Sequence, residues 1–312
     1  MSLSRRLRRI HLRPVLSEDG EEIVEEQGQR QLHGHFRRLP EGYPGTIMRI
    51  AVLGDVHLIA DDDPSRDLQQ VRAFFRAGVP AMRRCIAWLD SLELDAVLSV
   101  GDLIDWHSEE NVALAVDVMA GLRCPWHLTP GNHDLMHPKP GIPAGTYDLE
   151  PVELHRGAAT ACWARHGVAI SDRRVTIGGH DVLLVDSSAN RIDPGTSAWV
   201  RAERWSRPLL ISHVPLDRPI IRAFILGNDI SRHFAVESRV QAGSPDFFDD
   251  CVAARIPTVF TGHLHTPATL REKGTTFHLL DGSFARGSAP PTVAIVETHG
   301  DEVRVRSMTA PV

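Results

Sequence analysis

Five short polar motifs, each preceded by an apolar run as long as a buried strand, constrain the fold of this chain more than any other feature. The apolar runs are residues 49–53, 96–100, 125–129, 209–211 and 258–261. The motifs are Asp55-Val56-His57, Gly101-Asp102-Leu103-Ile104-Asp105, Gly131-Asn132-His133-Asp134, Ser212-His213 and Gly262-His263-Leu264-His265. Parallel strands of an open α/β sheet place functional residues at their carboxyl ends. The pattern therefore predicts an α/β fold in which the five motifs meet at one site.

The polar residues of these motifs are types that bind metal ions. Asp, Asn and His supply oxygen and imidazole donors, which suit Mn, Fe, Zn, Co or Ni. Asp55 and His57 lie two residues apart, so extended backbone points both side chains to the same side. A single His is more often a core or surface residue, and among 17 histidines a chance pair such as His33 and His35 is assigned no function. Five motifs in a fixed order instead predict a site for two metal ions.

The order D-x-H, G-D-x-x-D, G-N-H-D, a lone His and G-H-x-H resembles the pattern of the calcineurin-like metallophosphoesterases across residues 49–265. The resemblance implies a four-layer α/β/β/α sandwich of two mixed sheets flanked by helices, and two divalent metal ions. It implies that one ion is held by Asp55, His57, Asp102 and His265, and the other by Asp102, Asn132, His213 and His263. Asp102 would then bridge the ions, and His133 and Asp134 would occupy the catalytic positions.

Such a site suits phosphoester hydrolysis. Two cations roughly 3.5–4 Å apart stabilise the attacking and leaving oxygens and lower the pKa of bound water toward about 7. His133 is expected to protonate the leaving group or to hold a phosphoryl oxygen. Asp134 is expected to fix the tautomer of that imidazole. The expected metals are Mn, Fe or Zn, with Mn²⁺ the choice for an assay.

Details of the motifs favour some branches of the resembled family over others. Leu58 and Trp106-His107 stand where serine/threonine protein phosphatases have Gly and Arg-Gly, and Asp105 stands where purple acid phosphatases have a Tyr ligand. The pattern is nearest to bacterial class III cyclic nucleotide phosphodiesterases. We therefore expect a phosphodiesterase acting on a small nucleotide-like or other phosphodiester. The alternatives are a small-molecule phosphomonoesterase, a nuclease, and a catalytically silent binding scaffold of the same fold.

Two long intervals between motifs are expected to shape the substrate pocket, because loops at strand ends carry specificity. One separates His57 from Asp102, and the other separates His213 from His263. The candidate substrate-binding residues are Trp106, His107, Asn228, Arg232 and His233. Each has a structural role as its alternative; Trp106, for example, either stacks on a base or lies in the core.

The chain divides into an amino-terminal extension, residues 1–47, and a metallophosphoesterase domain, residues 48–312. The extension has a hairpin-like turn at residues 18–21 and a Pro/Gly-rich linker at residues 40–45, so it is an arm or a small β-hairpin. Within the domain, helices are predicted near residues 80–92, 112–119 and 151–166, and hairpin turns at 178–181, 273–274 and 299–301.

Composition excludes some function classes. The formal net charge of −6 argues against a nucleic-acid partner, so a small-molecule phosphoester is the expected substrate. No apolar run reaches about 18 residues and no hydrophobic leader follows Met1, so a cytoplasmic location without membrane contact is expected. The four cysteines lack metal-binding spacing and are expected to be reduced. A homodimer is left open.

Overall fold

The computed structural model describes residues 48–311, except residues 229, 231–234, 242–244 and 286–288. The expected amino-terminal extension therefore lies outside the described residues. Within them, the strands form two sheets, one of five strands and one of six.

The first sheet has the strand order β11-β10-β1-β2-β3. Its strands are β1 (Arg49–Leu53), β2 (Ala96–Ser99), β3 (Trp126–Leu128), β10 (Thr292–His299) and β11 (Glu302–Thr309). β1, β2 and β3 run parallel, and β10 and β11 add an antiparallel hairpin. The three strands that carry the first three motifs thus lie side by side with their carboxyl ends at one edge.

The second sheet has the order β4-β5-β6-β7-β9-β8. Its strands are β4 (Arg173–Ile177), β5 (His180–Val185), β6 (Leu209–Ser212), β7 (Thr258–Thr261), β8 (Ala268–Glu272) and β9 (Thr275–Leu279). The four central strands are parallel and the two edge strands antiparallel. The predicted hairpins are confirmed, although Gly178 and Gly179 alone form the first turn, with φ of 56° and 81°.

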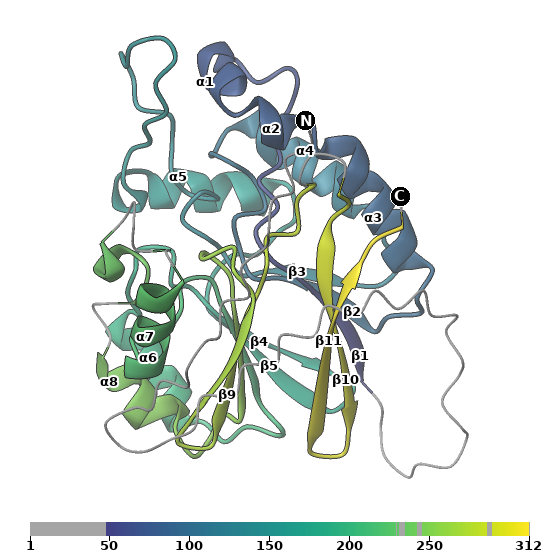
Figure 1. Cartoon of the computed structure of the whole chain (residues 1–312), viewed down its shortest axis with the longest axis vertical. Coiled ribbons are helices and arrows are strands. Elements are labelled where there is room, and N and C mark those ends of the chain that lie inside the picture. Colours follow the sequence, from purple (N-terminus) through teal and green to yellow (C-terminus); the bar gives the residue numbers. More distant parts are fainter. Residues whose placement is uncertain (1–47, 229, 231–234, 242–244, 286–288, 312) are drawn as a thin grey trace, which may run out of the picture.

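Helices cover the outer face of each sheet. Those against the first sheet are α3 (Val79–Asp90), α4 (Glu109–Met119) and α5 (Val152–Arg165). Those against the second are α6 (Pro194–Ala202), α7 (Pro219–Gly227) and α8 (Pro245–Phe247) with the π-helical turn η3 (Phe248–Val252). In Figure 1, α6 and α7 lie at the left and α3 at the right, with the strands between them. The short helices α1 (Arg66–Val71), α2 (Ala73–Arg76) and η2 (Val236–Ser238) belong to the two long intervals between motifs.

Alternation along β1 shows why the molecule has four layers. Ile50 and Val52 pack between the two sheets, whereas Ala51 and Leu53 pack against the helices outside the first sheet. Burying each large aliphatic side chain stabilises the folded state by about 1.5–3 kcal/mol, so the side chains on both faces of the strand are apolar and buried. Polar side chains are left to the strand ends. The expected four-layer sandwich of two mixed sheets is confirmed.

The longest helix among the described residues, α5, has 14 residues. None of the described helices combines the length and apolar character that a bilayer span requires.

Candidate metal centre

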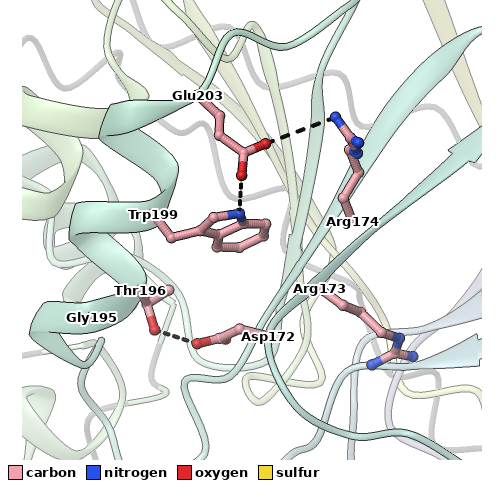
Figure 2. Close-up of a pocket in the computed structure, with 7 residues that line it drawn as sticks. All are labelled: Asp172, Arg173, Arg174, Gly195, Thr196, Trp199 and Glu203. Carbon is pink, nitrogen blue, oxygen red and sulfur yellow. Dashed lines mark hydrogen bonds and ion pairs between the residues drawn. The ribbon is translucent and has the colours of Figure 1, made fainter.

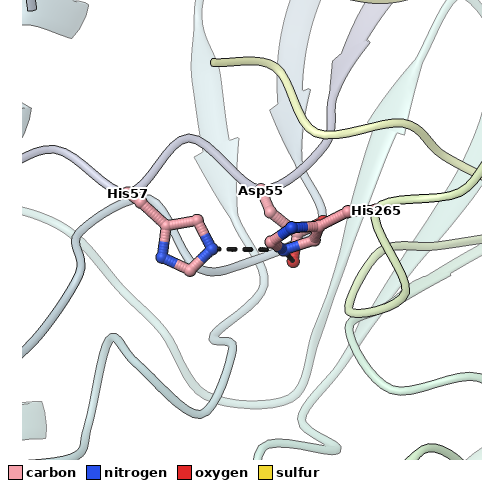
Figure 3. Close-up of side chains that lie close together, drawn as sticks. All are labelled: Asp55, His57 and His265. Atoms are coloured by element: carbon pink, nitrogen blue, oxygen red, sulfur yellow. Dashed lines mark hydrogen bonds and ion pairs between the residues drawn. The ribbon is translucent and has the colours of Figure 1, made fainter. Parts of the chain in front are cut away.

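Three predicted ligands form a first group, Asp55 and His57 from the loop after β1 and His265 from the turn after β7 (Figure 3). The Nε2 atoms of His57 and His265 lie 3.2 Å apart, and His265 Nε2 lies 3.3 Å from Asp55 Oδ1. Two imidazole nitrogens that face each other this closely repel through their lone pairs unless a proton or a cation lies between them. The first group therefore has the donors and the geometry of a cation site.

The other predicted ligands form a second group, Asp102, Asn132, His213 and His263. His213 Nε2 is at its centre, 3.2 Å from Asp102 Oδ2, from Asn132 Oδ1 and from His263 Nδ1. These donors come from the ends of β2, β3, β6 and β7. The second group therefore joins the two sheets at their carboxyl edge.

Asp102 lies between the two groups. Its Oδ2 atom is 3.2 Å from His213 Nε2 of the second group and 3.9 Å from His57 Nε2 of the first. One carboxylate oxygen thus faces donors of both groups, as the predicted bridging role requires. The structure brings all seven predicted ligands together.

Backbone strain marks the same residues. His57, Asp102, His263 and His265 have positive φ, at 56°, 51°, 68° and 50°. For residues other than glycine, this left-handed conformation costs about 1–3 kcal/mol, and several such residues gathered in one place often mark a functional site. Main-chain hydrogen bonds from Val56 and His57 to the Asp102 carbonyl, of 2.8 and 2.9 Å, hold part of this strained backbone.

Glycines let two of the loops approach one another. Gly101 has φ of 110°, and a Cβ atom there would lie 2.4 Å from the backbone nitrogen of Gly131. A Cβ atom on Gly131 would lie 2.1 Å from Asp102 Oδ1. Both contacts are far too short, so the close pairing of the second and third motifs requires glycine at both positions.

The ring nitrogens that face away from the site are anchored. His213 Nδ1 lies 3.1 Å from the Val100 carbonyl oxygen, and His263 Nε2 lies 3.0 Å from that of Ser238. His57 Nδ1 lies 2.8 Å from a carboxylate oxygen of Asp105. A ring nitrogen that donates to such an oxygen carries the proton, which leaves the other nitrogen unprotonated and directed into the site.

The site has an electrostatic preference for positive charge. Burial opposes ionisation of Asp55 and Asp102, yet neighbouring histidines hold the pKa of each carboxyl below its usual range. Burial likewise opposes a charge on His213, but Asp102 and Asp55 raise its pKa to about 9. Carboxylates that favour a proton at this position also favour a metal cation there.

His133 lies beside the ligands without joining either group. Its Nδ1 atom is 2.6 Å from the Asp105 carbonyl oxygen and 3.1 Å from the Tyr147 hydroxyl. Its Nε2 atom faces Asp102 Oδ2 at 4.0 Å, and its side chain is 19% exposed. Asp105 and Tyr147 therefore hold the Nδ1 side of the ring, and Nε2 points toward the ligands, where a substrate would bind.

The Asp134 carboxylate has other hydrogen-bond partners than the one expected. Its oxygens accept hydrogen bonds from the backbone nitrogens of Leu103, Ile104 and Gly131, at 2.9, 3.2 and 2.8 Å. Burial and the nearby charge of Asp102 raise its pKa to about 7. Asp134 thus ties two motif loops together. The expectation that it fixes the His133 tautomer is not met, because the groups on the His133 ring belong to Asp105 and Tyr147.

The sequence interpretation missed the residues that support the first group. Arg72 donates two hydrogen bonds, of 2.7 and 2.6 Å, to the Asp105 carboxylate, which faces His57 on its other side. Burial opposes the ionisation of Asp105, but Arg72 and His57 hold its pKa well below its usual range. Asp105 was visible as the second Asp of its motif, whereas nothing in the sequence distinguished Arg72 from its neighbours.

A second arginine, Arg239, also lies near the ligands. Burial lowers its pKa, while the charges of Asp102 and Asp55 oppose that shift. The same guanidinium contributes, after burial and His213, to lowering the pKa of His263 to about 3. Arg239 therefore places a positive charge on the side of the second group.

Three of the candidate substrate-binding residues lie among the described residues, and each bonds to or packs against other parts of the protein. Trp106 is fully buried, and its indole donates to Asp63 over 3.1 Å. His107 is buried, and its ring lies 4.5 Å from that of His137 at a tilt of 33°. The Asn228 side chain donates to the Phe224 carbonyl at the end of α7. Arg232 and His233 lie outside the described residues.

A separate open pocket of about 480 Å³ lies between α6 and β4 (Figure 2). Most of its polar side chains pair with one another, and Arg173 donates to the main-chain carbonyls of Ser171 and Leu128. Thr196 donates to Asp172, Trp199 donates to Glu203, and Glu203 also lies 3.8 Å from Arg174. The pocket contains none of the predicted ligands, so the metal centre is the better candidate for the functional site.

Comparisons with known proteins agree with this geometry. The sequence model of the calcineurin-like phosphoesterases matches residues 48–267. The fold resembles that of a dimetal phosphatase from Danio rerio, with TM-score 0.51 and 13% identity over 85% of this chain and 99% of that chain. It also resembles a purple acid phosphatase from yellow lupin (Lupinus luteus) seeds, with TM-score 0.50 and 13% identity over 85% of this chain and 52% of that chain. At such identities the similarity concerns the fold alone. No curated protein matches the chain in sequence.

Proposed function

The chain belongs to the calcineurin-like phosphoesterase family, and we propose that it hydrolyses small phosphodiesters with two divalent metal ions. Membership makes it a metal-dependent phosphoester hydrolase. The choice of diesters, the ligand assignment, the metal and the catalytic domain at residues 48–312 are parts of the proposal.

The observation that carries the proposal is the position of Asp102 between two groups of donors. Each group contains a carboxylate and two imidazoles within reach of a single ion, and the second adds the Asn132 oxygen. This mixture of oxygen and nitrogen donors fits Mn, Fe or Zn, and we propose Mn²⁺ for assays. When bound, the two ions supply a nucleophile from water near neutral pH and stabilise charge on the phosphoryl group.

The side chains of the protein have distinct roles in this proposal. In its doubly protonated form, His133 donates the Nε2 proton to the departing alkoxide, while its Nδ1 proton stays directed at the Asp105 carbonyl oxygen. Arg239 adds positive charge on the side of the second group, which favours an anionic phosphoryl group there. Asp134 and Asp105 position the loops and the imidazoles and do not contact the substrate.

The choice of a diester rests on the motif pattern, which is nearest to that of bacterial class III cyclic nucleotide phosphodiesterases, and not on the charge of the site. A phosphodiester carries one negative charge, whereas a monoester carries up to two near neutral pH. The Arg72 guanidinium already donates two hydrogen bonds to the Asp105 carboxylate, so its charge is balanced within the protein. We therefore assign no substrate contact to Arg72, and the two metal ions balance the charge of either class of ester, so the assay below decides between them.

The test compares bis(p-nitrophenyl) phosphate with p-nitrophenyl phosphate in the presence of Mn²⁺. We expect a higher kcat/KM for the diester and loss of both activities after exhaustive chelation. Asp55→Ala should lose activity, while the matched control Asp61→Ala, at a carboxylate 84% exposed, should retain it. A preference for the monoester would favour a phosphomonoesterase, and activity without metal would contradict the proposal altogether.

A further inference from the structure

Three phenylalanine rings form an aromatic wall beside the first group: Phe74, Phe75 and Phe284. Phe74 and Phe75 belong to α2, in the interval after the first motif, and Phe284 follows β9. Their centroids are 4.8–5.8 Å apart, and each pair is nearly perpendicular, at 74–82°. These are favourable edge-to-face contacts, so the three rings form one packed unit.

The wall directly contacts two predicted metal ligands. The Phe75 ring lies 4.6 Å from the His57 ring at a tilt of 34°. The Phe284 ring lies 5.3 Å from the His265 ring and 6.2 Å from that of His57. A substrate whose phosphoryl group sits at the first group must therefore place a substituent beside these rings or turn away from them.

The inner rings of the wall are held in place. The Arg72 guanidinium lies 4.3 Å from the centre of the Phe75 ring and 4.5 Å from that of Tyr147, while it pairs with Asp105. Such cation–π contacts fix the orientation of the ring. Phe75 is thus part of the same assembly that orients His57.

Phe284 is fixed by its own loop. Its ring folds over Gly282, where a Cβ atom would lie 2.1 Å from the ring. The Ser283 hydroxyl accepts a hydrogen bond of 2.9 Å from Gly54 and donates one of 2.7 Å to Thr292. The loop is therefore fastened to the end of β1, directly before the ligand Asp55.

Phe74 is the outer member of the wall. It is 47% exposed, and Val71, three residues before it, is 42% exposed. Exposed large apolar side chains that adjoin a functional site often contact a ligand. Here the exposed ring extends a rigid aromatic surface outward from metal ligands.

We propose that this aromatic wall binds a flat aromatic ring on one ester substituent of the substrate. The inference rests on the proposed phosphoesterase function and adds its substrate class, a phosphoester of an aryl alcohol or of a nucleoside. The anionic phosphoryl group lies at the two groups of ligands, and the aromatic substituent extends from the first group toward Phe74 and Phe284. A rigid wall loses little entropy on binding, which favours recognition of the ring.

Binding of phosphonates to the Mn²⁺-loaded protein tests the wall without turnover. Phenylphosphonate and methylphosphonate differ only in the ring and cannot be hydrolysed at an ester bond. We expect calorimetry to show tighter binding of phenylphosphonate. Phe74→Ala should weaken phenylphosphonate by roughly 3–10-fold, the size of a lost aromatic contact, and leave methylphosphonate unchanged. Phe74→Tyr should keep the preference.

Leu154→Ala, at an exposed apolar residue of α5, is the matched control and should keep the preference too. An adenine nucleoside monophosphate compared with ribose phosphate, as competitors, distinguishes a nucleobase from a simple aryl group. If an active enzyme bound the two phosphonates equally, or if Phe74→Ala weakened the binding of both equally, the aromatic-wall proposal would be wrong while the proposed phosphoesterase function would stand. If neither phosphonate binds and no phosphoester is cleaved, the proposed function fails with it.

Discussion

The first and second groups of predicted ligands differ in what holds their imidazole rings. In the second group, His213 and His263 are anchored by main-chain carbonyl oxygens. In the first group, His57 is anchored by the Asp105 side chain, which Arg72 holds in turn. The second group is thus anchored through main-chain atoms, although that of Ser238 belongs to the connecting element η2, whereas the first group depends on the side chains of Asp105 and Arg72. The two ions should therefore respond differently to substitutions outside the motifs.

The largest effect should follow from Asp102→Ala, which removes the carboxylate oxygen that faces imidazole Nε2 atoms of both groups. We expect both ions to be lost or displaced and hydrolysis to fall to background. Asp55→Ala should mainly weaken the first ion, because Asp55 belongs to that group alone. Elemental analysis of the purified variants measures this. Two ions per chain in Asp102→Ala would contradict the bridging assignment.

His133→Ala should keep both ions and lose turnover by roughly 10²–10⁴-fold, the range for a general acid or base. The loss should be larger for an alkyl or nucleoside ester than for a nitrophenyl ester, because a nitrophenolate hardly needs a proton to leave. Equal losses on both would make His133 a phosphate-binding residue. A fall in metal content would make it a ligand.

The difference between the groups is tested most sharply by Arg72→Ala. Without its guanidinium, Asp105 keeps a buried charge with less compensation and holds His57 less firmly. Supporting residues of this kind typically contribute about 10–100-fold to metal affinity. We expect such a loss for one ion and little change for the other in a Mn²⁺ titration.

Arg76→Ala is the matched control for Arg72→Ala. It removes an arginine from the same segment, but one paired on the surface with Asp61. Exposed ion pairs contribute about 0–1 kcal/mol, so metal binding should not change. If both variants weakened the binding of both ions equally, the proposed difference between the first and second groups would be wrong.

The smallest effect is expected from deletion of residues 1–47. Every residue that we assign to either group, or to the support of His57, follows Met48. The shortened protein should therefore hydrolyse a small aryl ester at nearly the full rate. A folded, soluble deletion protein with activity about 100-fold lower, a loss of the size expected for a catalytic group, would show that the extension completes the site.

The sequence predicted the parts of the molecule that follow from local patterns. Apolar runs placed the strands, and the motifs after them placed residues such as Asp55 and His213, because parallel strands bring their carboxyl ends together. Adjacency in the chain misled the prediction for Asp134, whose carboxylate turns to backbone nitrogens and not to the neighbouring imidazole.

Residues supplied by long connections could not be predicted. Arg72 and Phe284 reach the site through helices and turns whose spacing does not determine where a side chain points. Trp106 follows a motif directly, yet it packs with Ile59 and Leu68 in a small core of its own. Burial of that kind depends on partners far away in the sequence.

The central claim is that Asp102 joins two ions into one site, and electron paramagnetic resonance of the Mn²⁺-loaded protein tests it most directly. Two Mn²⁺ ions that share a bridging carboxylate are spin-coupled, so the wild-type spectrum should show exchange coupling. Asp55→Ala, which weakens one ion, should instead show the hyperfine lines of isolated Mn²⁺. A wild-type protein that gives only the isolated-ion spectrum when saturated with Mn²⁺ would contradict the account.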